Sequence, residues 1–151
     1  MIITGIACTP HMQNHILLSG AVDITRAATI PLFIEHKYRV GDVVRLDYVA
    51  NDLFCTAETD DEAALKLGFL SIAGKPLRRE ARADGRWLVH EFLCAEISVV
   101  ARPANSKCVV LERKPSDPFR ALAKTRQREL DLFADAFRKL ANGLQSIANL
   151  T

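Results

Sequence analysis

Apolar and polar residues alternate over much of the first 113 positions, which is the pattern of half-buried β-strands. The stretch 44–48 reads Val-Arg-Leu-Asp-Tyr, Gly41-Asp42 is typical of a turn, and Asp84-Gly85 is a strong hairpin signal. The pattern predicts strands at 2–9, 15–19, 28–36, 44–48, 53–58, 71–74, 77–83, 86–92, 92–101 and 107–113.

A short helix is predicted at 61–67, just before the candidate strand that begins at Ser71. Thr59 or Asp60 can cap its first turn, which is acidic, and Gly68 stands where the helix must end.

The last fifth of the chain predicts one long amphipathic helix after a proline-rich linker at 115–118. Apolar residues recur there at helical spacing and form a single stripe. The stripe consists of Phe119, Leu122, Leu130, Phe133, Phe137, Leu140, Leu144 and Ile147. Such a stripe can pack on the strand region or join copies of the chain as a short coiled coil, and the pattern fits both.

These elements predict a mostly β fold of the α+β class in two parts. Residues 1–114 form the strand-rich domain, and residues 115–151 form the linker and helix, which belong to the same domain or serve oligomerisation. A chain of 151 residues, of which 49% are hydrophobic and 25% charged, has the composition of one packed globular domain.

Charge and hydropathy exclude several classes of partner. The formal net charge of +2 is too small to indicate nucleic acid, and the local cluster at 78–86 is expected to be a solvated hairpin face. No apolar run approaches the ~18 residues of a membrane span, and residues 1–20 do not resemble a signal peptide. We therefore expect a cytosolic protein that binds neither nucleic acid nor membrane.

The four cysteines are expected to be buried free thiols. Cys8, Cys55, Cys94 and Cys108 form no CxxC pair and have no histidine at ligand spacing, so we predict neither disulfides nor a metal site.

Two residues are candidates for nucleophilic chemistry. His36 follows an apolar strand, and a strand end can hold a general base rigidly outside the core. Ser71 stands between large apolar residues, but its hydroxyl needs a nearby base to react. The plainer alternatives are a surface histidine beside Glu35 and a hydroxyl bonded to a backbone carbonyl.

Glu96 is the single charge in the apolar run 92–101. A carboxylate held against a sheet among apolar neighbours needs a partner. Orienting a histidine is one such role, and an ion pair with Arg78 or Arg102 is the alternative.

In their order along the chain, these residues resemble the prohead maturation proteases of tailed phages. The resemblance rests on Pro-Leu-Phe-Ile-Glu-His at 31–36, Ser-Ile-Ala-Gly at 71–74 and Glu-Ile-Ser-Val-Val-Ala-Arg-Pro-Ala-Asn at 96–105, and it covers roughly residues 1–113. That family is similar in fold to the herpesvirus assemblins. The resemblance therefore implies a compact assemblin-like β-barrel, with the short helix before the nucleophile and the long helix at the C-terminus.

The resemblance also implies a catalytic trio without metal or cofactor. His36 would be the base, Ser71 the nucleophile and Glu96 the orienting residue, with His90 as the rival third member because assemblins use a second histidine. Ile72, through its backbone, and Arg102 are the candidate oxyanion or substrate contacts.

The implied activity is that of a serine endopeptidase inside the assembling prohead in the bacterial cytoplasm. Its implied substrates are capsid and scaffold polypeptides, with its own chain as a further candidate. Because dimerisation governs assemblin-like proteases, the resemblance favours a homo-oligomer, a dimer or larger, joined by the C-terminal helix. The family's serine segment usually runs Gly-Leu-Ser-Ile-Gly, whereas residues 69–73 are Phe-Leu-Ser-Ile-Ala. This departure keeps an alternative open, in which a degenerate protease-like module binds capsid or scaffold without cleaving it.

Overall fold

The computed structural model describes residues 1–11, 15–116, 127, 133–134 and 137–139. The chain divides into two units, Met1–Pro115 and Ser116–Thr151, which are described separately.

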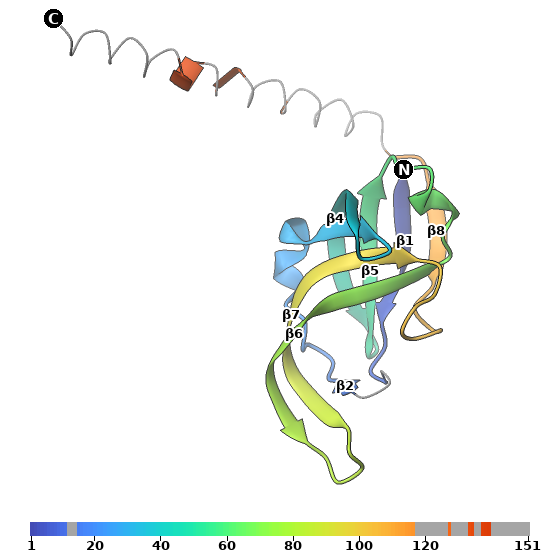
Figure 1. Cartoon of the computed structure of the whole chain (residues 1–151), viewed down its shortest axis with the longest axis vertical. Helices are drawn as coiled ribbons and strands as arrows, with labels where there is room; N and C mark the ends of the chain where they lie inside the picture. The colour runs from blue at the N-terminus through green and yellow to red at the C-terminus, as the bar shows by residue number, and fades with distance from the viewer. Residues whose placement is uncertain (12–14, 117–126, 128–132, 135–136, 140–151) are drawn as a thin grey trace, which may run out of the picture. The chain divides into compact units, whose positions relative to one another are not determined.

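The first unit is mostly β, with one mixed sheet of eight strands (Figure 1). The strands are β1 (Ile2–Cys8), β2 (His15–Leu17), β3 (Pro31–Ile34), β4 (Tyr38–Val49), β5 (Asp52–Thr59), β6 (Phe69–Ala81), β7 (Trp87–Val100) and β8 (Val110–Lys114). Two 3-10 turns, η1 (Ile24–Thr29) and η2 (Ala64–Lys66), lie between them.

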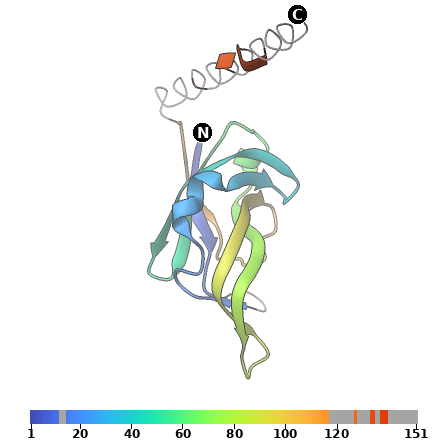
Figure 2. The same ribbon diagram turned by 90° about the vertical axis from the view of Figure 1, so that its left-hand side faces the viewer.

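The strand order is β2-β7-β3-β4-β5-β1-β8, and β6 pairs with β7. The long strand β7 is parallel to β2 and β3, while β6 lies antiparallel to it and extends with it into an arm that projects from the body (Figures 1 and 2).

The start of β6 is joined to the segment that leads into β8. The Leu70 N–H donates to the Cys108 carbonyl and the Val110 N–H to the Gly68 carbonyl, both at 2.9 Å. The same segment bonds to β1, where the Ile6 N–H donates to the Val109 carbonyl at 2.9 Å. Through these bonds the sheet closes on itself.

The core lies on one face of this closed sheet. Leu32, Leu70, Ile97 and Val99 come from three adjacent strands, and each is at most 1% exposed. Because neighbouring residues on a strand point to opposite faces, their sequence neighbours, including Ser71 and Ser98, point away from this core.

Several local predictions were wrong. Gly41 and Asp42 lie inside β4 and form no turn; a Cβ at Gly41 would lie 2.0 Å from the Glu58 carbonyl oxygen, so glycine permits this close strand pairing. The strand expected at 28–36 is reduced to β3, because Asp23 caps η1, which occupies 24–29.

The helix expected at 61–67 is only the single turn η2. Asp61 accepts a hydrogen bond from the Ala64 N–H at 2.8 Å, but the backbone returns to an extended conformation at Leu67, two residues before β6 begins. The chain therefore has room for one turn between β5 and β6.

The long C-terminal helix is not seen as an element, because most of 119–147 lies outside the described residues. Those described at 127, 133–134 and 137–139 are helical. Phe133 and Phe137 are exposed, with ring centroids 6.2 Å apart. No helix in the described part of the chain is long and apolar enough to span a membrane.

Candidate functional site

His36 lies in the turn between β3 and β4, two residues beyond the last residue of β3. Glu35 and His36 have φ angles of 49° and 56°, in the left-handed region that residues other than glycine rarely adopt. Strain of this kind clusters at functional sites, where the surrounding structure must hold it in place.

Three hydrogen bonds hold this turn. The Glu35 N–H donates to the Val99 carbonyl at 3.0 Å, and the Lys37 N–H donates to the Ile34 carbonyl at 2.9 Å. The Glu35 carboxylate accepts the Ala101 N–H at 2.7 Å. The turn is therefore fastened to the end of β7.

The fastened turn brings the His36 ring to Glu96 on β7. His36 Nδ1 lies 2.5 Å from Glu96 Oε1, and the side chains are 41% and 14% exposed, respectively. When Nδ1 carries the proton and donates it to the carboxylate, Nε2 of the neutral ring is left as an acceptor, which is the form a general base requires.

The alternative ion pairs of Glu96 do not form. Arg78 pairs with Glu91 at 3.0 Å, and Arg102 makes no ion pair within the described residues. Glu96 is therefore partnered by a histidine, as the orienting role requires.

Ser98, to which the sequence analysis gave no role, also bonds to Glu96. Its Oγ lies 3.1 Å from Glu96 Oε1, and the residue is 0% exposed. A polar residue two positions after Glu96 on the same strand face was the signal that could have identified it.

Ser71 lies beside this group on β6, as the register partner of Ser98. Paired residues of an antiparallel ladder point to the same face, so Ser71, Ser98 and Glu96 share one face of the sheet. The Ser71 residue is 7% exposed.

The Ser71 hydroxyl is not hydrogen-bonded to any described residue. It bonds neither to His36 nor to a backbone carbonyl, which was the alternative to a catalytic role. Every fully buried side-chain oxygen in the described part of the chain has a hydrogen-bond partner. Because Ser71 Oγ has none, it is not fully buried and retains contact with solvent. The structure thus brings His36 and Glu96 together directly and places Ser71 alongside, without a bond between Ser71 and His36. Catalytic hydrogen bonds are often looser in an enzyme without substrate.

His90 is not near His36. It lies on the projecting arm, where Nε2 is 3.5 Å from a Glu80 carboxylate oxygen. Six residues of extended strand, about 20 Å, separate it from Glu96. This position favours Glu96 over His90 as the third member.

The candidate oxyanion contacts differ in placement. Ile72 points its side chain to the core, opposite Ile97, so only its backbone could serve the site. Arg102 is exposed in the loop after β7. Asn105 fastens that loop by donating to Thr9 Oγ1 at 2.6 Å and to the His11 carbonyl at 2.8 Å.

A pocket of about 250 Å³ lies between β2, β6 and β7. Leu17, Ile72 and Val89 line it, and Ile72 points to the face opposite Ser71. None of His36, Ser71 and Glu96 lines this pocket, although Ala73, the register partner of Glu96, does.

The cysteines are free and buried, as predicted. Burial raises the pKa of Cys8 and of Cys94 to about 12 and that of Cys108 to about 11, and it also raises the pKa of Cys55. No group of three histidine, cysteine or acidic residues in the described part of the chain could hold a metal ion.

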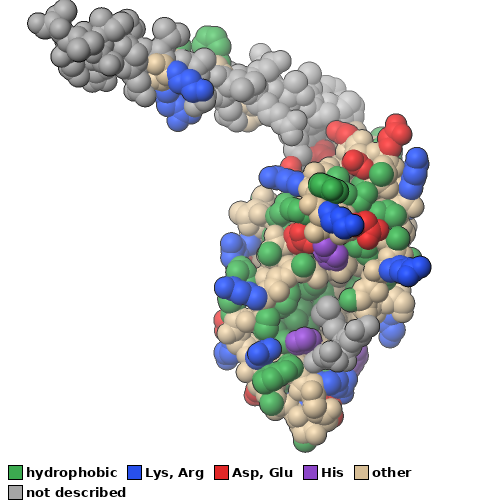
Figure 3. Space-filling view, viewed as in Figure 1, with side chains coloured by type: hydrophobic (Ala, Val, Ile, Leu, Met, Phe, Trp, Pro, Cys, Tyr) green, Lys and Arg blue, Asp and Glu red, His purple; other side chains and the backbone are tan. Residues whose placement is uncertain are grey.

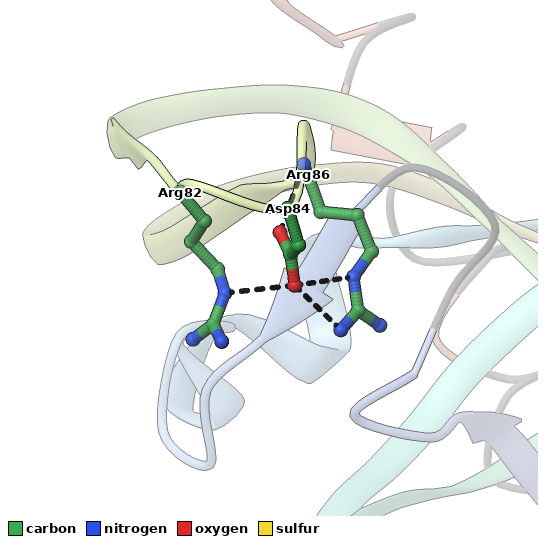
Figure 4. Close-up of polar contacts among 3 residues, drawn as sticks. All are labelled: Arg82, Asp84 and Arg86. Carbon is green, nitrogen blue, oxygen red and sulfur yellow. Dashed lines mark hydrogen bonds and ion pairs between the residues drawn. The ribbon is translucent and has the colours of Figure 1, made fainter.

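The basic cluster at 78–86 lies on the projecting arm. At its tip, the Asp84 carboxylate accepts bonds from Arg86 at 2.8 Å and from Arg82 at 3.3 Å (Figure 4). The hydrogen bonds from Arg86 lower the pKa of Asp84 to about 2. Basic and acidic side chains are also interspersed on the face in Figure 3. The cluster is a solvated hairpin face, as predicted.

The chain matches no protein-family model, no curated protein and no solved structure.

Proposed function

We propose that this protein is a serine endopeptidase of the prohead-protease kind, with an assemblin-like barrel. The observation that carries the proposal is the 2.5 Å contact between His36 Nδ1 and Glu96 Oε1, on the sheet face shared with Ser71. Histidine, carboxylate and an accessible hydroxyl from three strands or turns are the parts of a serine triad.

In the proposed reaction, His36 Nε2 takes the Ser71 proton as Oγ attacks a peptide carbonyl carbon. Glu96 stabilises the resulting imidazolium through Nδ1. The imidazolium then protonates the leaving amine, and water hydrolyses the acyl-enzyme with the same histidine as base. The reaction needs no metal or cofactor.

A polypeptide substrate fits the position of Ser71 at a strand edge. Beyond Leu70, the outer edge of β6 pairs with no strand in the described part of the chain. An extended peptide can add to such an edge through backbone hydrogen bonds. The resemblance described above is the support for proposing capsid and scaffold chains, inside an assembling phage head in the host cytoplasm, as these polypeptides.

A degenerate assembly module is the second candidate. The absence of a bond from Ser71 to His36 among the described residues favours it, together with the changed residues around the serine.

A fluorophosphonate probe distinguishes the two candidates without knowledge of the substrate. The activated serine displaces fluoride and becomes covalently labelled, so mass spectrometry should locate the label at Ser71. Ser71→Ala and His36→Ala should abolish labelling, while Ser106→Ala, an exposed serine in the β7–β8 loop, should not change it. Wild-type protein that remains unlabelled would favour the assembly module, whereas labelling that persists in Ser71→Ala would show that another residue is the nucleophile.

A further inference from the structure

Ser98 has a position that neither substrate contact nor nucleophilic attack explains. It is 0% exposed, so its hydroxyl cannot reach a substrate. It lies on the central strand β7, with Phe33 of β3 and Ser71 of β6 as its register partners. Strands on both sides therefore fix its backbone.

The Ser98 hydroxyl donates to the carboxylate oxygen that also contacts His36. Both contacts, at 3.1 Å from Ser98 Oγ and 2.5 Å from His36 Nδ1, end on Glu96 Oε1. A glutamate side chain has three rotatable bonds, and one contact to a half-exposed ring does not fix them. The second donor, on a rigid strand, selects the rotamer that points Oε1 at His36.

We propose that Ser98 is a positioning residue that holds Glu96 against His36. The proposal rests on the proposed protease function for its effect on rate, but the geometry that it describes can be tested without activity. It predicts that loss of the hydroxyl lets Glu96 turn to solvent and frees the imidazole.

The test of rate uses the full chain and the fluorophosphonate probe. Ser98→Ala should slow labelling of Ser71 by about 10- to 100-fold, the usual cost of misplacing a catalytic group by about 1 Å. In a Glu96→Gln background the same substitution should cause no further loss, because Ser98 acts through Glu96. Thr4→Val removes a partly buried hydroxyl on β1, a strand that carries none of the site residues, and should leave the rate unchanged.

The test of geometry is the proton NMR signal of His36 Nδ1. Ser71→Ala should retain the downfield signal of a short hydrogen bond, whereas Ser98→Ala should lose or shift it. Ser98→Cys, which keeps the size but donates weakly, should behave like Ser98→Ala and provides a second variant should that one not fold.

The results separate the two proposals. An unchanged Nδ1 signal and rate in Ser98→Ala, or losses from Ser98→Ala and Glu96→Gln that simply multiply, would overturn the role of Ser98. Wild-type protein that remains unlabelled would overturn the protease function, and the Nδ1 signal would still decide the role of Ser98.

Discussion

At the scale of single residues, two backbone hydrogen bonds hold the turn at Glu35 and His36, and one side-chain contact that sequence patterns do not reveal adds to them. Two successive non-glycine residues with positive φ cost roughly 1–3 kcal/mol each, so they persist only where other bonds over-determine them. The Glu35 carboxylate supplies such a bond at the Ala101 N–H.

Glu35→Ala should therefore slow fluorophosphonate labelling of Ser71 and lower stability by about 1 kcal/mol, the usual net worth of one hydrogen bond. Glu35→Gln keeps an acceptor oxygen at the same place and should retain most of the labelling rate. Equal rates in Glu35→Ala and wild type would mean that the other turn bonds suffice to place His36.

The residues of the site were predictable to different degrees. Glu96 was found because a lone charge in an apolar strand requires a partner. Ser98 was missed because a serine on a strand has many local hydrogen-bond partners; its two-residue spacing from Glu96 shows the shared face, but only the structure shows that its hydroxyl donates to the Glu96 carboxylate. The turn at His36 was missed because no glycine marks its positive φ.

At the scale of elements, the fold depends on a close crossing at Gly5. A Cβ there would lie 2.3 Å from the Val109 carbonyl oxygen and 2.9 Å from a Leu70 methyl carbon. Backbone cannot move aside as a flexible side chain can. Glycine therefore lets β1 approach the segment that closes the sheet.

Gly5→Ala should destabilise the protein by at least about 1–3 kcal/mol, the cost of overpacking a tight contact. Urea unfolding followed by circular dichroism measures it. Gly68→Ala is the control, since a Cβ there meets nothing within 4 Å and its φ is not positive. Similar midpoints for Gly5→Ala and Gly68→Ala would show that the crossing is looser than described.

Most strands were predictable because alternation of apolar and polar residues indicates one buried face. The Asp84-Gly85 hairpin was predictable because Gly85 supplies the positive φ of 79° that the turn requires. The turn expected at Gly41 failed because the same residue also serves close strand pairing, and sequence does not separate the two uses. The prediction of a helix at 61–67 failed because capping residues indicate where a helix can begin, but not how few residues remain before β6 starts.

At the scale of the whole molecule, the four buried thiols link stability to alkaline pH. Burial raises each thiol pKa, so between about pH 9 and pH 11 the unfolded chain loses protons that the folded chain keeps. Stability must therefore fall as pH rises through this window and be independent of these groups below it.

The free energy of unfolding should be lower at pH 10 than at pH 8. Above pH 9, each buried thiol should lower it by up to about 1.4 kcal/mol per pH unit. Urea titrations at a series of pH values measure the slope, and Cys55→Ala should remove one thiol's share. A flat profile up to pH 10 would contradict burial of these groups.

The second unit is the part of the chain that we expect to join copies of the protein. Phe133 and Phe137 are exposed, and monomers rarely leave a large apolar stripe uncovered. Replacing both by serine should lower the mass measured by sedimentation before it lowers the melting temperature. A wild-type monomer at tens of micromolar would contradict an oligomerising role.

Closure of the sheet at residues 108–110 also affects the order in which the strands can pair while the chain is being synthesised. His36, Ser71, Glu96 and Ser98 all emerge before Cys108, yet until that segment follows, β1 and the start of β6 keep unpaired edges. A nascent chain would thus carry every residue of the candidate site in an open sheet. Pairing of β8, the last strand of the first unit, would then be the step that closes the sheet around the site.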